Sequence, residues 1–542
     1  MATYRDVLKW GDKRETSLDE GMKKLVKEKF NFSDLDLANK YLAGNEELII
    51  ENRNQISDEI INKFVEISGS ENVSKTVKDI ANHSYGKHYE ELIKLRLNII
   101  ENQPDLVIYP RTAEEVEQIV KICNEEQIAI VPFGGGSSVT CALQMPNGGV
   151  SLDLTKHLNK IISISEKNHS VTVQAGMFGP AFEKELNDYK SGYTCGHFPQ
   201  SFEFSTVGGW VAARGAGTFS TGYGKIEEMV LALNIVTPAG NIQTKDFPAD
   251  AEAWDLNHLF IGSEGVLGVI TEVTMKIRKY RPQNISYISF IFKTFEDATE
   301  AMRESMQAGY GKPHLYRISD PEETDIAFKI KGFENTFADK FLKLKGYKSG
   351  SRTLMFAAVD GDADYTSFLK KKLKKTAKKH SGFYIGGGAT KKWLEQRYSS
   401  AYNREPMMDL GIITDTIETA VSWENLNNLW SKVRSYLDSR PNTTTMIHIS
   451  HVYENGANLY ITFLSPMNKG NEINDYLELH KGLVDTIVAN KGSISHHHGI
   501  GRALSKWMKQ ELSETELALM QSTKDYLDPK GIMNPGNMLG LK

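Results

Sequence analysis

The chain has 542 residues, of which 40% are hydrophobic and 25% are charged, and its net charge is −5. This length allows two or three domains around a large core, and the negative charge argues against the basic surface that nucleic-acid binding requires. The three cysteines, Cys123, Cys141 and Cys195, are too few for a disulfide framework and form no CxxC pair.

Targeting signals are not recognisable in the sequence. The start, MATYRDVLKWGDKRE, lacks the apolar segment of a secretory signal. No run approaches the roughly 20 apolar residues that a membrane-spanning helix needs, and the final GLK is not a peroxisomal address. We therefore predict a cytoplasmic protein in a reducing compartment.

Residues 1–100 have the periodicity of polar, amphipathic helices. The stretches SLDEGMKKLVKEKF (17–30) and SDEIINKFVEISG (57–69) place apolar residues at helical spacing. Ser17 and Ser57 each precede acidic residues, as helix N-caps do. We predict an N-terminal helical region over 1–100.

Residues 101–282 alternate between strands and helices. The stretch TAEEVEQIVKICNEEQ predicts a helix capped by Thr112, with Glu115 three residues later. Strands are predicted at DLVIYP, IAIVPF, GVSLDL, KIISIS, SVTVQA, MVLALNIVTP and VLGVITEVTMKIR. The pattern predicts an α+β domain.

Residues 283–500 predict a second α+β unit, and residues 501–542 predict a helical tail. SYISFIFK and RTLMFAAVD are expected to be strands, and FEDATEAMRESMQAG and DYTSFLKKKLKKTAKKH to be helices. TTTMIHISHVY and NLYITFL are rich in β-forming residues.

Three loops rich in glycine and serine adjoin strands or helices of the first α+β domain. They read GGGSS (134–138), STVGGWVAARGAG (205–217) and GSEGVLG (262–268). Glycine lets backbone N–H groups approach an anion closely, and successive amides form an anion-binding nest. Neither a Walker pattern nor G-x-G-x-x-G occurs. The loops suit a long, phosphate-containing ligand bound in an extended form.

These segments carry a family resemblance. PFGGGSSV, GHFPQSFEFSTVGGWVAARGAG and GSEGVLGVITEVTMKIR resemble the FAD-binding domain (PCMH type) of the vanillyl-alcohol-oxidase flavoproteins. GHFPQSFEFSTVGGW, AYNRE, HISHVYENGANLYITF and SISHHHGIG resemble the alkylglycerone-phosphate synthase family more closely, over nearly the whole chain. The resemblance implies a two-subdomain FAD-binding domain over 101–282, a cap domain for the substrate over 283–500, and a C-terminal segment, 501–542, that returns to the FAD domain.

The resemblance also implies which residues bind FAD. The pyrophosphate is expected on Gly134, Gly135, Gly136, Ser137 and Ser138. Ser137 stands where some superfamily members attach FAD covalently through a histidine, so non-covalent FAD is predicted. The other expected FAD contacts are Pro132, Phe133, Val139, Gln200, Ser201, Phe202, Glu203, Phe204, Ser205, Thr206, Gly209, Ala213, Arg214, Gly215, Ala216, Glu264, Gly265, Gly268, Val269 and Ile270.

A hairpin is predicted where TMIHISHVY and NLYITF flank ENGA. Asn455-Gly456 favours a two-residue type I′ turn, and that register places His451 opposite Tyr460. Such a pair either transfers a proton or packs the sheet, and the pattern alone favours packing. The resemblance instead implies that Tyr460 is the catalytic tyrosine, and we place His451 beside the substrate.

Three consecutive histidines, His496, His497 and His498, stand in SISHHHGIG. Side chains alternate along an extended strand, so His496 and His498 are expected on one face and His497 on the other. We predict no metal site, because no further Cys or His pair stands at zinc spacing. The resemblance implies that the triplet and His197 support acid–base chemistry near the flavin.

Arg317 in LYRISD and Arg404 in AYNRE match two arginines of the family. A guanidinium binds phosphate through bidentate, charge-assisted hydrogen bonds. The resemblance implies that Arg404 binds the substrate phosphate, and that Arg317 has a structural or flavin-side role at the same site.

The implied activity is exchange of the acyl chain of acyl-dihydroxyacetone phosphate for a long-chain alcohol, in ether lipid biosynthesis. The first alternative is an FAD-dependent dehydrogenase or oxidase of a 2-hydroxy acid or glycerol 3-phosphate on the same fold. The second is a flavin-binding protein without catalysis. The substrate is expected to be lipid-like and the protein to form a homodimer, and peripheral membrane contact is left open.

Overall fold

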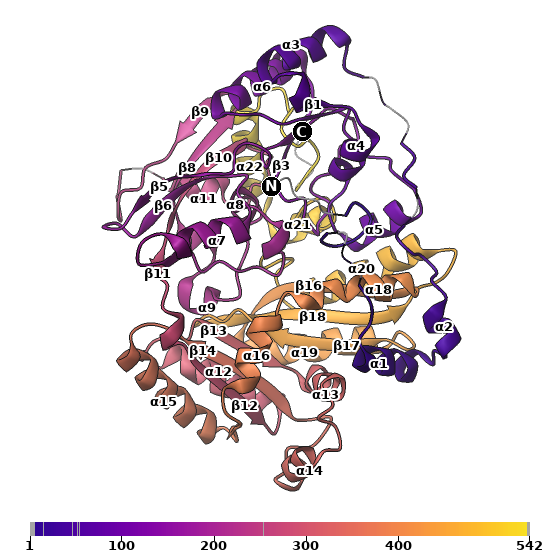
Figure 1. Ribbon diagram of the computed structural model, residues 1–542, viewed down its shortest axis with the longest axis vertical. Coiled ribbons are helices and arrows are strands. Elements are labelled where there is room, and N and C mark those ends of the chain that lie inside the picture. Colours follow the sequence, from indigo (N-terminus) through magenta and orange to yellow (C-terminus); the bar gives the residue numbers. More distant parts are fainter. Residues whose placement is uncertain are drawn as a thin grey trace.

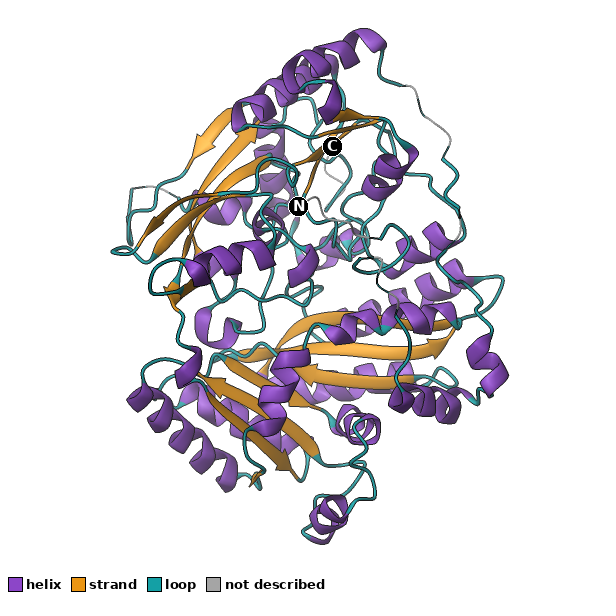
Figure 2. Ribbon diagram, viewed as in Figure 1, coloured by secondary structure: helices purple, strands orange, loops and turns teal. Residues whose placement is uncertain are grey.

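Two α+β halves make up the molecule, one above the other in Figure 1, in a computed structural model that describes residues 6–12, 14, 16–45, 47–50, 53, 55–252 and 254–538. Figure 2 shows sheets in both halves, with helices packed around them. We call the upper half the FAD-binding domain and the lower half the cap, after the two domains expected from the sequence.

The FAD-binding domain contains two main sheets. The first has the order β1-β2-β4-β3, and its parallel core is formed by β2 (Leu106–Ile108), β4 (Val150–Asp153) and β3 (Ile130–Phe133) beside the short antiparallel β1 (Val73–Ser74). The second is antiparallel, with the order β5-β6-β10-β8-β9. Its strands are β5 (Ile161–Ser165), β6 (Ser170–Gln174), β10 (Val269–Lys276), β8 (Val230–Thr237) and β9 (Gly240–Gln243).

A two-stranded ribbon, β7 (Tyr193–Thr194) with β11 (Arg278–Lys279), marks the passage from the FAD-binding domain to the cap. The cap is built on one antiparallel sheet with the order β15-β12-β14-β13-β17-β18-β16. Its strands are β12 (Ser286–Phe292), β13 (Leu315–Ser319), β14 (Thr353–Val359), β15 (Phe383–Tyr384), β16 (Ile412–Ser422), β17 (Thr444–Ile449) and β18 (Gly456–Pro466).

Helices cover both halves. Those of the first 282 residues are α1 (Glu20–Phe30), α2 (Asp34–Ala38), α3 (Asp58–Ser68), α4 (Val77–Ser84), α5 (Tyr89–Arg96), α6 (Ala113–Glu126), α7 (Gly179–Asp188), α8 (Val207–Ala212), α9 (Ser220–Tyr223), α10 (Ile226–Met229) and α11 (Leu256–Phe260). Those that follow are α12 (Phe295–Gln307), α13 (Pro321–Ile330), α14 (Phe337–Leu344), α15 (Ala363–Lys379), α16 (Gly388–Gln396), α17 (Ser399–Tyr402), α18 (Arg404–Asp409), α19 (Trp423–Asp438), α20 (Glu472–Ala489), α21 (Ser505–Glu511) and α22 (Glu514–Leu527). No helix among the described residues is long and apolar enough to cross a membrane.

The caps and strands compare closely with the sequence predictions, but one helix cap differs and several strands were not predicted, among them β13 and β16 of the cap sheet. Ser57 and Thr112 cap α3 and α6 as predicted, by accepting backbone N–H groups of the first turn. Ser17 does not cap α1, because Asp19 lies nearer the first turn and its carboxylate accepts the N–H of Met22 at 2.8 Å. Strand β16, at one edge of the cap sheet, was not predicted at all.

The two chain termini each tie the halves together. The N-terminal helix α1 packs against α13 of the cap and α5 packs against α20, whereas α3 packs against α6 of the FAD-binding domain. The chain beyond the cap returns to the FAD-binding domain, where Met533 bridges to Ile130 of β3 and the buried ammonium of Lys524 bonds Asp528 and two backbone carbonyls.

A buried ion-pair cluster fixes the N-terminal region to the cap. Arg96 at the end of α5 is fully buried, and its guanidinium contacts Glu405 at 2.5 Å and Asp409 at 2.9 Å, both on α18. Removing one partner of such a cluster leaves a buried carboxylate without its counter-charge.

We expect Arg96→Met to lower the free energy of unfolding by about 3–5 kcal/mol, because Glu405 keeps its burial but loses its counter-charge, and Asp409 is left with the exposed Lys40 at 3.1 Å. The measurement is the shift in thermal midpoint. The matched control is Lys184→Met, which breaks an ion pair with Asp188 whose side chains are 76% and 65% exposed; it should leave the midpoint unchanged. Equal shifts for the two variants would contradict the assignment.

Candidate active site

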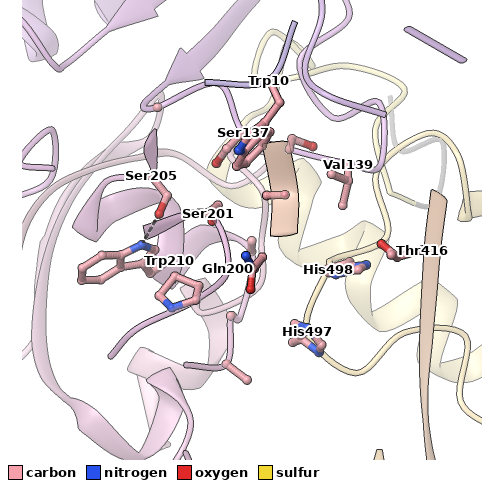
Figure 3. Close-up of a pocket in the computed structure, with 18 of the residues that line it drawn as sticks. Trp10, Ser137, Val139, Gln200, Ser201, Ser205, Trp210, Thr416, His497 and His498 are labelled. Atoms are coloured by element: carbon pink, nitrogen blue, oxygen red, sulfur yellow. Dashed lines mark hydrogen bonds between the residues drawn. The ribbon is translucent and has the colours of Figure 1, made fainter. Parts of the chain in front are cut away.

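A cavity of about 610 Å³ lies between the FAD-binding domain and the cap. The FAD-binding domain contributes the glycine loop after β3 and the segment around α8, and the cap contributes β16, β17 and β18. Figure 3 shows Gln200 and Ser201 on one side, facing His497 and His498 on the other. Helices α1 and α13 line one end.

The wall on the FAD side is made largely of backbone. A Cβ added to Gly135 would overlap the carbonyl oxygen of Phe204, and one added to Gly134 would overlap the hydroxyl of Thr206. Gly136 has a φ of +61°, which L-residues rarely adopt. The remaining small residues of this wall are Ala175, Gly208, Gly209, Ala212, Ala213, Gly215 and Ala216. Such a surface allows a flat cofactor and its phosphates to lie directly on the main chain, so these residues fit FAD.

Most of the expected FAD contacts line this cavity: Pro132, Phe133, Gly134, Gly135, Gly136, Ser137, Ser138, Val139, Gln200, Ser201, Ser205, Thr206, Gly209, Ala213, Gly215, Ala216, Glu264, Gly265, Gly268 and Ile270. Val269 does not. It precedes Ile270 on β10, and because successive side chains on a strand point to opposite faces, it lies in the domain core instead.

Four further side chains expected at FAD contact protein instead. Phe202 stacks between Trp210 and Tyr398, and Phe204 packs edge-on against Trp10. These aromatic contacts join the FAD-binding domain to the N-terminal region and to the start of α17.

The other two are charged. Glu203 accepts a hydrogen bond from the hydroxyl of Tyr402 at 3.1 Å, and Arg214 forms an ion pair with Glu227 at 3.3 Å. These contacts hold Glu203 and Arg214 outside the cavity lining. The nearby residues Ser205, Ala213 and Gly215 do line the cavity.

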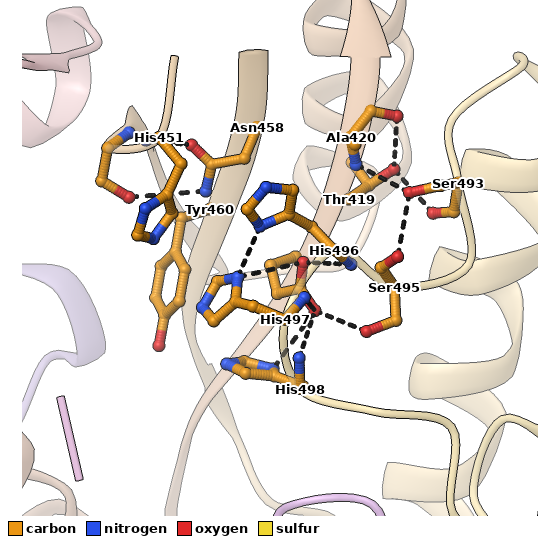
Figure 4. Close-up of polar contacts among 12 residues, drawn as sticks. Thr419, Ala420, His451, Asn458, Tyr460, Ser493, Ser495, His496, His497 and His498 are labelled. Atoms are coloured by element: carbon orange, nitrogen blue, oxygen red, sulfur yellow. Dashed lines mark hydrogen bonds and ion pairs between the residues drawn. The ribbon is translucent and has the colours of Figure 1, made fainter. Parts of the chain in front are cut away.

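The histidine triplet is wrapped around one buried carboxylate (Figure 4). Glu418 of β16 is 2% exposed and accepts the backbone N–H groups of His496, His497 and His498 at 2.7, 3.1 and 3.0 Å. The hydroxyl of Ser495 donates to the same carboxylate at 2.8 Å. Burial opposes ionisation of Glu418, but the nearby His497 holds its pKa well below the usual range. The carboxylate is therefore charged and replaces water as the acceptor for this loop.

The expectation of an extended strand at the triplet is wrong, because consecutive amides that converge on one carboxylate require a tight loop. His497 and His498 line the cavity together, and His496 does not. Nε2 of His496 lies 2.6 Å from the hydroxyl of Tyr453. Strand geometry predicted that His497 would point away from the other two histidines. In the structure it is His496 that lies outside the cavity lining.

The loop also brings two histidines of the triplet close to His451, which lies more than forty residues earlier in the chain. Nitrogens of His451, His496 and His497 all lie within 4.8 Å of one another, and Nδ1 of His496 is 2.9 Å from Nδ1 of His497. Nδ1 of His451 is 2.6 Å from the hydroxyl of Ser220. The alternation of side chains expected for an extended strand therefore does not keep these nitrogens apart. The absence of a metal stays a prediction.

Tyr460 pairs with His448, so the predicted partner His451 was wrong. His448 stands opposite Tyr460 between β17 and β18, and their rings stack at 4.7 Å with an angle of 21°. The turn lies one residue earlier than predicted, since the N–H of Tyr453 donates to the carbonyl of Gly456 at 2.8 Å. Neither Asn455 nor Gly456 has the positive φ that a type I′ turn needs.

A buried amide changes the register between the turn and the pair formed by His448 and Tyr460. The side-chain oxygen of Asn458 accepts the N–H groups of Ser450 and His451 at 2.9 and 2.8 Å. One residue of β17's extension is thereby left without a strand partner, as in a β-bulge. A period-two pattern in the sequence does not contain this information.

Tyr460 is set up as a proton donor beside the neutral imidazole of His498. Burial raises the pKa of Tyr460 to about 12, and its hydroxyl donates to Thr416 at 3.2 Å. The ring stacks on His497 at 5.9 Å and meets His498 edge-on at 5.7 Å. Burial, followed by the charge of His497, lowers the pKa of His498 to about 4. At neutral pH the phenol therefore carries its proton and His498 is free to accept one.

A buried ion pair supports the other face of Tyr460. Arg317 on β13 contacts Glu323 at 2.6 Å, and Nδ1 of His448 lies 3.2 Å from the same carboxylate oxygen. Burial opposes ionisation of Glu323, but the charge of Arg317 lowers its pKa to about 2. Arg317 thus compensates a protein carboxylate, and through Glu323 and His448 it orients Tyr460.

Arg404 keeps donors for a ligand. One of its terminal nitrogens donates to the carbonyl of Lys87 at 2.6 Å, and its buried Nε has no hydrogen-bond partner among the described residues. The nearby carboxylate of Asp415, which also lines the cavity, accepts a hydrogen bond from the hydroxyl of Tyr476 at 2.7 Å. Arg404 thus has capacity to bind an anion, a property it shares with Arg317 and Arg397, which line the same cavity and whose buried Nε atoms also lack a partner among the described residues.

His197 lies in the wall of the cavity and is 0% exposed. It packs on Trp210 at 4.8 Å, and neither of its ring nitrogens has a hydrogen-bond partner among the described residues. Burial, followed by the charge of His497, lowers its pKa to about 3, so the ring is neutral. An unpartnered polar ring in a cavity wall is costly unless a ligand satisfies it.

The end of the cavity near α1 and α13 is apolar. Its side chains are Met22, Leu25, Ile326, Ile330, Met446 and Leu464. The cavity thus combines a backbone cradle, a cluster of Tyr and His, an available arginine and an apolar end, which suits a ligand with a charged head and a hydrocarbon chain.

Comparison with known proteins gives consistent matches. The family described as "FAD binding domain" matches residues 104–245, and "FAD linked oxidases, C-terminal domain" matches residues 281–538. The chain is 32% identical to the alkyldihydroxyacetonephosphate synthase of Dictyostelium discoideum over 473 residues, 84% of this chain and 77% of that protein. A solved alkyldihydroxyacetonephosphate synthase structure, 28% identical, superposes with a TM-score of 0.84 and covers 98% of both chains.

A redox relative matches less closely. The mitochondrial D-lactate dehydrogenase [cytochrome] of Arabidopsis thaliana is 28% identical over 449 residues, which cover 81% of this chain and 74% of that protein.

We expect Glu418→Ala to speed amide hydrogen exchange in the segment 493–501. The backbone N–H groups of His496, His497 and His498 lose a charged acceptor. A hydrogen bond to a charged group contributes about 1.5–3 kcal/mol, and its loss corresponds to roughly 10–100-fold faster local exchange. The control is Glu322→Ala on α13, whose carboxylate forms a surface ion pair with Lys29. Unchanged exchange in 493–501 would show that Glu418 does not hold the loop.

We expect Gly135→Ala to lose FAD, because the added methyl group overlaps the backbone at Phe204 and displaces the loop. The FAD content of purified protein, measured by its visible spectrum after denaturation, should fall at least about tenfold. Gly388→Ala is the control, since a Cβ there meets nothing within 4 Å. Wild-type FAD content in Gly135→Ala would rule out this wall as the cofactor cradle.

Proposed function

The chain belongs to the alkyldihydroxyacetonephosphate synthase family of FAD-dependent enzymes, and on that premise we propose that it exchanges the acyl chain of acyl-dihydroxyacetone phosphate for a long-chain fatty alcohol in ether lipid biosynthesis. The observation that carries the proposal is the cavity itself. Buried acid–base groups, a guanidinium and an apolar end open into one space.

Each part of this substrate has a counterpart in the cavity. Arg404 would bind the phosphate through its unpartnered Nε and a terminal nitrogen. The apolar end formed by α1, α13, β17 and β18 would take the hydrocarbon chain, since burial of each CH₂ contributes about 0.8 kcal/mol. The head group would then lie between the glycine loop and Tyr460.

The side chains supply the proton transfers that the exchange requires. The substrate carbon must lose a proton, and the incoming alcohol must lose its hydroxyl proton. Neutral His498 can accept a proton, and the phenol of Tyr460 can donate one and recover it through the neighbouring imidazoles. The oxidised ring of bound FAD would supply an electron-accepting site for the substrate carbon.

The remaining assignments rest on the same premise. We propose that FAD is held without a covalent bond, because Ser137 of the glycine loop offers no nucleophile comparable to histidine. His197 would satisfy its ring nitrogens on FAD or substrate, and His451 and His496 would orient His497. Homodimer formation, a cytoplasmic location and contact with lipid are further parts of this proposal.

Oxidation of a 2-hydroxy acid or of glycerol 3-phosphate is the competing activity. It is favoured less, because the D-lactate dehydrogenase of Arabidopsis thaliana is a more distant relative than the synthase of Dictyostelium discoideum.

The test is incorporation of labelled hexadecanol into acyl-dihydroxyacetone phosphate by the FAD-loaded protein. We expect Tyr460→Phe to reduce incorporation by about 10²–10⁴-fold, the usual contribution of an acid–base group, with FAD content unchanged. Tyr526→Phe is the control, because that ring is 76% exposed. Anaerobic bleaching of the flavin by D-lactate or glycerol 3-phosphate, without incorporation of alcohol, would establish the competing activity instead.

A further inference from the structure

We propose that residues 331–348, here called the α14 tip, dock the protein on an anionic lipid bilayer. This inference takes its rationale from the proposed function, since a fatty alcohol resides in lipid. It is argued from the exposed side chains and charges of the tip, and its test does not depend on turnover.

The α14 tip displays large apolar side chains to solvent. Phe337 is 87% exposed, Leu344 is 85% exposed and Phe341 is 40% exposed. They stand at positions i, i+4 and i+7 of α14, which places them on one helix face. Phe333, 55% exposed, precedes the helix. Contiguous exposed apolar side chains of this size mark an interaction surface.

The opposite face of α14 anchors the tip to the cap. Leu342 packs in a small apolar cluster with Tyr347 and Phe328. Asp339 is buried and forms ion pairs with Arg352 and with Lys343. Helix α14 is therefore packed against the cap through one face, and this packing holds its apolar opposite face toward solvent.

Charge decides which partner the surface fits. The α14 tip contains five lysines, at 331, 340, 343, 345 and 348, against Glu334 and the buried, paired Asp339, in a chain whose net charge is −5. Phenylalanine and leucine framed by lysine suit the boundary of an anionic bilayer: the rings enter the acyl region and the ammonium groups reach the head groups.

A second exposed apolar pair provides a contrast within the same molecule. Trp254 is 87% exposed and Phe247 is 55% exposed, which matches the exposure at the α14 tip. Their segment, DFPADAEAWD, carries four acidic residues, and the single lysine beside it, Lys245, forms an ion pair with Glu252. Exposure alone would make both patches lipid-binding, whereas the charge argument assigns only the α14 tip.

The position of the tip fits delivery of a lipid. Helix α13 leads directly into it, and Ile326 and Ile330 of α13 line the apolar end of the cavity. Figure 1 shows α14 at the extremity of the cap, on the side away from the FAD-binding domain. A bilayer could therefore contact the tip without steric obstruction from the upper half.

The experiment is co-sedimentation of the full-length, FAD-loaded protein with vesicles of phosphatidylcholine alone or with about one third phosphatidylserine. We expect binding to the anionic vesicles that weakens as salt is raised, because charged surfaces are screened. Phe337→Ser combined with Leu344→Ser should reduce binding at least tenfold. Phe247→Ser combined with Trp254→Ser is the matched control and should bind like the wild type.

Three results would overturn the proposal: no wild-type binding to anionic vesicles, equal losses in the two double variants, or a dimer that dissociates in the α14 variant, which would make this face a protein interface. Incorporation of hexadecanol from detergent micelles should be unchanged in the α14 variant. Absent incorporation with intact vesicle binding would refute the proposed function and leave the docking surface standing.

Discussion

Two carboxylates, the buried Glu418 and the partly buried Glu264, hold the segment 495–501, and the geometry of the candidate site depends on them. Glu418 of the cap collects three backbone N–H groups at the histidine triplet, and Glu264 of the FAD-binding domain accepts the N–H groups of Ile500 and Gly501. A charged acceptor buried in this way is stable only when several donors surround it. Glu418 and Glu264 therefore fix the two ends of the segment, and we expect substitution of either carboxylate to release one end.

This clamp explains how two halves of different fold present one site. The cap sheet places His448, Tyr460 and Glu418 in one row across β17, β18 and β16, because directly paired residues of antiparallel strands face the same side. Glu418 then brings His497 and His498 over the ring of Tyr460, and Glu264 joins that loop to the glycine-rich wall. Both halves thereby contribute residues to the lining of one cavity.

Several parts of the site could be predicted from the sequence and others could not. The glycine loop and the strands around it were predicted, because a strand that runs into Gly134–Gly136 is a local pattern. His448 and Glu418 were missed for different reasons. The partner of Tyr460 depends on a bulge created by the buried amide of Asn458, and β16 was overlooked although IITDTIETAV is rich in β-branched residues. Val269 and Phe202 were misassigned because a motif does not state which neighbour faces the ligand.

The sequence by itself determined the α+β class, the glycine-rich cradle and the set of ionisable residues available for chemistry, since these follow from local patterns and from residue type. Only the tertiary structure decided which of those residues meet. Strand register, the division of the histidine triplet and the shifted pKa of Tyr460 arise from contacts between segments far apart in the chain, as between Glu418 and His498. Burial and pairing are properties of packing, and a linear pattern does not specify them.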